Sequence, residues 1–245
     1  MLVADRIHML GTRSVHWYAV EDGGRFTVID MGNPKQWPQL VTLLDSLGHS
    51  LDVVEAILLT HAHPDHVGNA EHVRVESGAK VWVHPADEAM ATGEAPMRMP
   101  PSIVKYLWRP AVFRYMVTAM REGAMKPPPI RELAFFNDGE ELDVPGKPRV
   151  IHTPGHTPGS CSLHMPQRSA LFAGDALATY NPFTSSIGPT LLPDLVTVDM
   201  VEARKSLERL VDIKAETVFV GHGEPWTGGV LEAVQAVRQT APAGG

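Results

Sequence analysis

The sequence feature that most constrains this chain is an apolar run that ends directly in a dense group of polar side chains. Residues 53–60 are mostly apolar, which is typical of a buried strand. Two imidazoles, a carboxylate and a third imidazole follow at once, at His61, His63, Asp65 and His66. Because a strand end followed by a tight turn can aim alternate side chains at one point, this run predicts a metal site. The alternative is a solvated turn in which Asp65 caps the next helix.

Three further polar residues occupy the same kind of position at the end of a predicted strand. They are His156 after residues 149–152, Asp175 after residues 170–174, and His222 after residues 217–220. In layered α/β folds, ligands gather at strand ends. We therefore expect donors from four strand ends to converge on one site.

The remaining hydrophobic periodicity alternates between strand-like and helix-like segments. Residues 15–30 predict a hairpin, because two apolar runs flank an Asp-Gly-Gly turn. The other expected elements are strands at 80–84 and 160–165 and helices at 34–47, 67–76, 110–123, 200–211 and 230–239. This order predicts an α/β domain in which helices cover sheets.

The composition excludes several classes of protein and favours nitrogen ligands. The chain has 12 histidines but one cysteine, so imidazole rather than thiolate would bind a metal, which suits zinc, with iron or manganese as alternatives. The lone Cys161 cannot form an internal disulfide, which fits a reducing, cytoplasmic compartment. No apolar run is long enough for a membrane span. The net charge of −7 argues against nucleic acid as a partner.

Residues 86–134 differ from the rest of the chain. They are rich in methionine and proline and hold more basic than acidic residues. We expect a helical, lid-like insertion within a single domain that spans residues 1–245. The aromatic and methionine side chains that are candidates to face a pocket are Trp108, Phe113, Tyr115 and Met116. Such a surface suits an apolar or anionic small molecule, or the face of a second copy in a homodimer.

The order and the surroundings of these donors resemble the metallo-β-lactamase superfamily. The resemblance rests on His61-x-His63-x-Asp65-His66 followed by His156, Asp175 and His222. The flanking phrases also match, namely Thr153-Pro154-Gly155-His156-Thr157-Pro158-Gly159, Ala173-Gly174-Asp175 and Gly221-His222-Gly223. The resemblance implies an α/β fold of the αββα type, with two mixed β-sheets flanked by helices.

The same resemblance implies a site for two divalent metal ions. The first ion would be held by His61, His63 and His156, and the second by Asp65, His66 and His222. Asp175 would bridge them. The implied activity is that of a binuclear hydrolase, in which a metal-bridging hydroxide attacks a small ester, thioester or lactone. In this scheme Asp65 orients the nucleophile, and Tyr180 is a candidate hydrogen-bond donor to the substrate.

Differences between this chain and individual branches of the superfamily indicate which branches it resembles most. Asp175 stands where some β-lactamases have a cysteine ligand, and the chain is most similar to the lactonase and hydroxyacylglutathione hydrolase-like branches. Three alternatives remain open: a phosphodiester hydrolase with the same site, a mononuclear iron dioxygenase of sulfur compounds, and a metal-binding scaffold without catalysis. A complete second ligand set favours two ions over one. We expect a small-molecule substrate, no nucleic acid and no membrane as partners.

Overall fold

The computed structural model of the chain describes residues 1–95, 97, 106 and 108–239. The first strands form a sheet of seven strands, in the order β1-β2-β3-β4-β5-β6-β7. Their bounds are β1 Leu2–Ala4, β2 Ile7–Thr12, β3 Val15–Asp22, β4 Arg25–Ile29, β5 Val54–Leu58, β6 Lys80–Val83 and β7 Ala134–Phe135. The pairs from β1 to β4 are antiparallel, whereas the pairs from β4 to β7 are parallel. The sheet is therefore mixed.

A second sheet of four strands has the order β13-β10-β9-β8. Its strands are β8 Arg149–His152, β9 Cys161–Met165, β10 Ala170–Gly174 and β13 Thr217–Val220. Only the β10–β13 pair is parallel among its three pairs. A separate two-stranded ribbon joins β11 Ala178–Tyr180 to β12 Ile187–Thr190.

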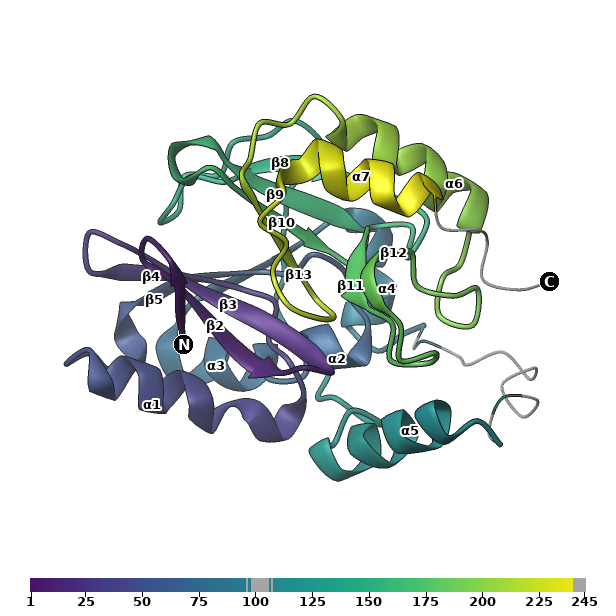
Figure 1. The fold of residues 1–245 in the computed structure, drawn as a ribbon. Coiled ribbons are helices and arrows are strands. Elements are labelled where there is room, and N and C mark those ends of the chain that lie inside the picture. Colours follow the sequence, from purple (N-terminus) through teal and green to yellow (C-terminus); the bar gives the residue numbers. More distant parts are fainter. Residues whose placement is uncertain (96, 98–105, 107, 240–245) are drawn as a thin grey trace.

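Helices cover the outer face of each sheet, as Figure 1 shows. Next to the first sheet lie α1 (Pro38–Ser46) and α3 (Ala70–Ser77), and next to the second lie α6 (Met200–Ser206) and α7 (Gly229–Gln239). Side chains along a strand alternate between the two faces of a sheet. In β3, for example, Trp17 packs toward the helices, and Tyr18 packs toward the second sheet. The expected αββα arrangement is confirmed.

The expected insertion appears as helices between β6 and β7. They are α4 (Glu88–Ala91) and α5 (Pro110–Glu122), and α5 lies apart from the helices that cover the sheets (Figure 1). The parts of the expected insertion at 96, 98–105 and 107 lie outside the described residues. The short remaining helices are α2 Pro64–Val67, η1 Pro34–Gln36, η2 Leu51–Val53, η3 Pro85–Asp87, η5 Pro166–Arg168 and η6 Leu207–Leu210. None of the described helices is both long and apolar enough to cross a bilayer.

Most elements expected from periodicity are present, but five strands were not predicted. These are β1, β2, β7, β11 and β12. Strand β2 contains Gly11 and ends with partly exposed residues, so its alternation is weak. Strands β11 and β12 are short, and β12 contains Gly188 and Pro189, which usually punctuate loops. Their pairing depends on contacts with distant residues that periodicity does not report.

An aromatic cluster joins the two sheets. The ring of Tyr18 lies edge-on to Phe172 and Phe219, with centroid distances of 5.3 and 5.2 Å. Its hydroxyl donates a hydrogen bond of 2.7 Å to the carbonyl oxygen of Val220, on the second sheet. Cys161 packs in the same core. One tyrosine therefore ties both sheets through packing and through a buried hydrogen bond.

Replacing Tyr18 by phenylalanine tests this tie. Tyr18→Phe keeps the ring but removes the donor to Val220, so we expect the free energy of unfolding to fall by about 1–2 kcal/mol. Chemical denaturation measures this change, and the slope with denaturant concentration should stay the same. Unchanged stability would show that the hydroxyl contributes nothing to holding the sheets together.

Candidate metal centre

The residues expected to bind metal come together where four strands of both sheets end. Residues 61–66 follow β5, His156 follows β8, Asp175 follows β10 and His222 follows β13. Three groups of these side chains have ligand atoms that all lie within 4.8 Å of one another. The groups are His61/His63/His156, His61/His66/Asp175 and Asp65/His66/His222. The first and the third, which we call the first and second trios, share no residue.

The carboxylate of Asp175 lies between the two trios. Its Oδ2 is 3.2 Å from Nε2 of His156, in the first trio, and 3.1 Å from Nε2 of His222, in the second. Its Oδ1 is 3.6 Å from Nε2 of His66. One side chain therefore reaches ligand nitrogens of both trios, which is the position that a bridging ligand requires.

Several of these atoms are buried and accept or donate no hydrogen bond among the described residues. They are Nε2 of His61, His66 and His156, together with Oδ1 of Asp175. Buried polar atoms are nearly always satisfied in folded proteins, so a cluster of unsatisfied ones needs an explanation. A divalent cation would satisfy all of them, and a set of imidazoles and carboxylates suits zinc or iron. The residues present therefore fit a metal.

Neighbouring groups orient four of the five imidazoles through their other nitrogen. The Nδ1 contacts are His61 with Thr60 Oγ1 (3.1 Å), His66 with Asp30 Oδ2 (2.9 Å), His156 with Thr197 Oγ1 (3.2 Å) and His222 with the carbonyl of Ser14. The carboxylate and the carbonyl can only accept. Both threonine hydroxyls already donate elsewhere. Each Nδ1 therefore carries the proton, and each Nε2 is free to bind a cation.

Asp30 anchors the loop that carries the first histidines. It ends β4 in a left-handed conformation, with φ of +58°, which is unusual for a residue with a side chain. Its carboxylate accepts hydrogen bonds from the backbone N–H and the hydroxyl of Thr60 and from Nδ1 of His66. Asp30 therefore supports His66 in the site.

Asp87 is a positioning residue that the sequence reasoning missed. Its buried carboxylate accepts hydrogen bonds from the N–H of Ala62 (3.0 Å), the N–H of Gly159 (2.7 Å) and the hydroxyl of Thr157 (2.7 Å). It thus ties the loop of His61 and His63 to the loop of His156. The only local signal is an aspartate after His84-Pro85, and nothing near it in sequence indicates its partners.

The surroundings of the imidazoles lower the pKa of some and raise the pKa of others. Burial, together with neighbouring imidazoles, lowers the pKa of His61 and His63 well below the usual value, so both are neutral at pH 7. Burial opposes a charge on His66 as well, but the carboxylates of Asp175 and Asp30 raise its pKa to about 10. Although burial resists ionisation of Asp175, His222 and His66 hold the pKa of its carboxyl well below the usual range. A metal ion would take the place of the proton on His66.

Gly221 leaves room for this packing beside His222. A Cβ at this position would lie 2.3 Å from Oδ1 of Asp175 and 2.6 Å from Cε1 of His66. Any side chain would therefore displace two members of the cluster. The glycine is required by close approach of the backbone to the site rather than by an unusual φ.

A cavity of about 130 Å³ opens onto the cluster. Besides His63, Asp65, His156, Asp175 and His222, its wall is largely apolar. The larger apolar residues of the wall are Met97, Tyr115, Met116, Met125, Phe183, Leu192 and Val196. The described lining residues include no lysine or arginine. The candidate metal ligands therefore form one side of the cavity. Uncharged and mostly apolar side chains form the other side, which we call the roof.

The insertion contributes to this roof, but not with all of the residues expected. Tyr115 and Met116 line the cavity. Trp108 and Phe113 were expected to face it as well, but they are 77% and 63% exposed and do not line it. Trp108 precedes α5, and Phe113 is exposed on α5. Helical periodicity predicted the helix, but it does not show which side of a helix faces the rest of the domain.

The two tyrosines near the site differ in their surroundings. The hydroxyl of Tyr115 lies 3.3 Å from Oδ2 of Asp65, and burial together with nearby carboxylates raises its pKa well above the usual value. The ring of Tyr180, the tyrosine that the sequence suggested, lies under the guanidinium of Arg13, at 4.6 Å. Tyr180 is not among the described residues that line the cavity.

Alignments with similar proteins cover most of this chain. YobT of Bacillus subtilis (strain 168) is 29% identical over 215 residues, which cover 86% of this chain and 83% of YobT. The probable metallo-hydrolase YflN of the same organism is 27% identical over 243 residues, which cover 92% of this chain and 86% of YflN.

A solved structure is similar in both sequence and fold. The crystal structure of TTHA1623 in a di-iron-bound form is 27% identical, with a TM-score of 0.66, and the alignment covers 94% of this chain and 98% of that one. The sequence model of the metallo-β-lactamase superfamily matches residues 10–222, which include every residue of both trios and Asp175. This chain belongs to the metallo-β-lactamase superfamily.

Proposed function

We propose that this protein is a hydrolase that uses two divalent metal ions to cleave a small ester, thioester or lactone with an apolar acyl group. The observation that carries this proposal is the presence of two separate ligand trios with the Asp175 carboxylate between them. A metallo-hydrolase relative, YflN, supports the reaction class. The cavity above the trios supports the substrate class.

The metal ions would be held by the first and second trios and shared by Asp175. Divalent ions at these residues would polarise the scissile carbonyl and make water a better nucleophile near neutral pH. We propose zinc, because neutral imidazoles dominate the ligand set. The di-iron form of TTHA1623 makes iron the first alternative, and manganese is a further one.

Two residues of this chain would position the reactants. Asp65 faces the cavity and offers a carboxylate oxygen that can accept a hydrogen bond from the attacking water and so hold it in place. A roof of methionine, phenylalanine and aliphatic side chains would exclude bulk water from the acyl group. Tyr180 stays a proposal as hydrogen-bond donor to the substrate, although its stacking on Arg13 gives it a structural role as well.

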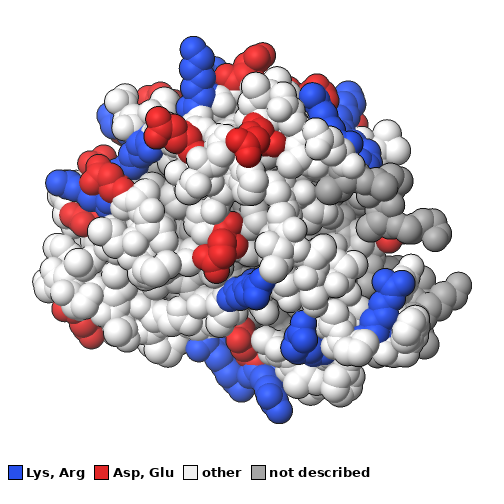
Figure 2. Space-filling view, viewed as in Figure 1, with Lys and Arg blue, Asp and Glu red and all other residues white. Residues whose placement is uncertain are grey.

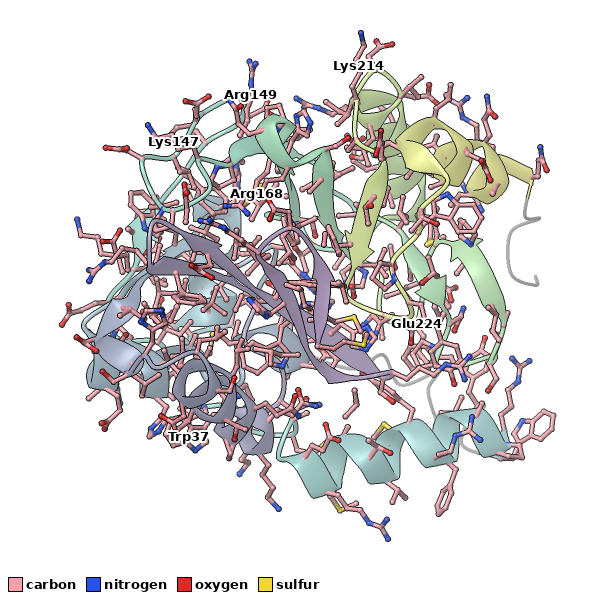
Figure 3. All side chains as sticks on the ribbon, turned by 60° about the vertical axis from the view of Figure 1, so that its left-hand side comes forward. Trp37, Lys147, Arg149, Arg168, Lys214 and Glu224 are labelled. Atoms are coloured by element: carbon pink, nitrogen blue, oxygen red, sulfur yellow. The ribbon has the colours of Figure 1, made fainter. Side chains whose placement is uncertain are left out.

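The charge distribution supports a neutral substrate over an anionic one. No lysine or arginine is among the described residues of the cavity wall. In Figure 3, Lys147, Arg149, Arg168 and Lys214 lie on the far side of the molecule from α5, whose inner side lines the cavity. The described cavity wall would add no lysine or arginine to the metal ions in binding a phosphodiester or a carboxylate, so we rank the phosphodiesterase below the esterase or lactonase.

The alternative of a mononuclear iron dioxygenase requires only one occupied trio. The second trio is complete and partly unsatisfied in its hydrogen bonding, which supports two ions instead. A scaffold without catalysis would not need a cavity that opens onto the ligands. Elemental analysis of the purified protein separates one ion from two and zinc from iron.

Partners and location are proposals of the same kind. Figure 2 shows basic and acidic side chains interspersed on one face of the molecule, and the net charge of −7 supports partners other than nucleic acid. The buried, unpaired Cys161 supports a cytoplasmic location. A homodimer would be detected by sedimentation.

Replacing the shared carboxylate should remove both ions. For Asp175→Ala we expect the metal content to fall at both trios and kcat/KM to fall on the order of 100-fold or more, because both metal ions would lose the ligand that they share. The measurements are elemental analysis and hydrolysis of a panel of lactones, thioesters, phosphodiesters and β-lactams.

A matched control for this variant is Asp45→Ala, which removes an exposed carboxylate on α1. This control should keep its metal content and activity. Retention of two ions and full activity in Asp175→Ala would rule out a shared carboxylate. Preferential hydrolysis of phosphodiesters by the unaltered protein would replace the proposed substrate class with the second candidate.

Filling the cavity tests where the acyl group lies. Ala119 lies on α5 and lines the cavity, so Ala119→Leu should lower kcat/KM about tenfold for long acyl substrates and leave short ones nearly unchanged. The measurement is a series of esters of increasing acyl length. Ala111→Leu makes the same change on the same helix at a residue that does not line the cavity, and should have little effect. Equal effects on all chain lengths would place the acyl group elsewhere.

A further inference from the structure

Helix α5 is fixed to the rest of the domain at its C-terminal end by partly buried polar contacts. Two side-chain amides meet one carboxylate there, since Asn33 Nδ2 and Gln36 Nε2 donate hydrogen bonds of 2.5 and 2.6 Å to Glu122 Oε2. The carbonyl of Asn33 in turn accepts from Asn69 Nδ2, which also donates to the carbonyl of Met31. The end of α5 is therefore connected to the segment next to the metal-binding loop.

The other half of α5 is held by apolar packing. Val112 is buried against Phe183 and Leu195, and the rings of Tyr115 and Phe183 lie 4.8 Å apart. Arg114 adds a hydrogen bond of 3.0 Å from Nη2 to Oγ of Ser185. Contacts on both sides of Tyr115 thus fix the direction in which its ring points.

The hydroxyl of Tyr115 reaches the second trio. It donates a hydrogen bond of 3.3 Å to Oδ2 of Asp65, the same oxygen that lies 3.7 Å from Nε2 of His222. Asp30 and Asp87 each accept hydrogen bonds from two or more donors, as described above. For Asp65, by contrast, Tyr115 is the hydrogen-bond donor recorded within the described part of the chain.

We propose that Tyr115 is a positioning residue that orients Asp65, so that metal binding at the second trio depends on the docking of α5. This inference rests on the proposed function only in taking both trios as metal sites. The insertion then has two roles, because the same helix that covers the cavity also completes the ligand geometry beneath it. Within the described residues the hydroxyl of Tyr115 bonds to Asp65 and to no member of the first trio, so its loss should affect one ion and spare the other.

The test is a metal titration of the full chain, free of metal at the start and without substrate. Tyr115→Phe keeps the ring and removes the donor, and we expect one of the two binding steps to weaken about tenfold while the other is unchanged. Tyr106→Phe is the matched control. Tyr106 belongs to the same apolar cluster, and no hydrogen bond of its hydroxyl is recorded within the described residues. Circular dichroism and denaturation check that both variants remain folded.

A double-mutant cycle with Asp65→Asn shows whether Tyr115 acts through Asp65. If it does, Tyr115→Phe should weaken metal binding much less when Asp65 is already altered. Additive effects, a shift of less than about twofold in Tyr115→Phe, or an equal shift in Tyr106→Phe would each overturn the inference. If the unaltered chain binds two ions but hydrolyses nothing, the proposed function fails while this inference stands, and the two failures are thereby distinguished.

Discussion

The structure depends on a buried carboxylate surrounded by imidazoles from different strands. Asp175 lies within 3.2 Å of ligand nitrogens of His156 and His222, which belong to different trios. A buried carboxylate is costly unless charge and hydrogen bonding compensate it. Here the compensation comes from protonated imidazoles in the metal-free chain and would come from cations once metal binds. The close approach of Gly221 and the tight turns after each strand follow from the need to crowd so many donors around one group.

Much of this site could be predicted because it follows from a simple rule of layered folds. Each of the seven expected ligands lies in the loop or the short helix that comes after a strand, and ends of strands on two packed sheets meet at one edge. Strands β5 and β10 were recognisable because they are short apolar runs that end in glycine or polar residues. The helices that cover the sheets were recognisable from periodicity and caps, such as Asp199 at the start of α6, whose side chain accepts two backbone N–H bonds.

The residues that support the ligands could not be predicted in the same way. Asp87 receives hydrogen bonds from residues 25 to 72 positions away, and Tyr115 lies 50 positions from Asp65. Neither contact leaves a periodic or local signal in the sequence. Tyr180 is close in sequence to Asp175, which made it a natural candidate, whereas Tyr115 lies far away in sequence but directly beside Asp65 in space. Proximity along the chain is informative for ligands at strand ends and uninformative for what surrounds them.

The insertion shows how substrate choice and metal binding can be coupled in this fold. The strand ends of both sheets meet at one edge, where Asp65 lines the cavity. Helix α5 closes that edge with Tyr115, Met116 and Ala119, and its attachment through Glu122 continues to the segment beside His66. A change of insertion would therefore alter the cavity wall and the support of Asp65 together. In this chain, a change of the cavity wall need not leave the metal site unchanged, because the wall and the site share a helix.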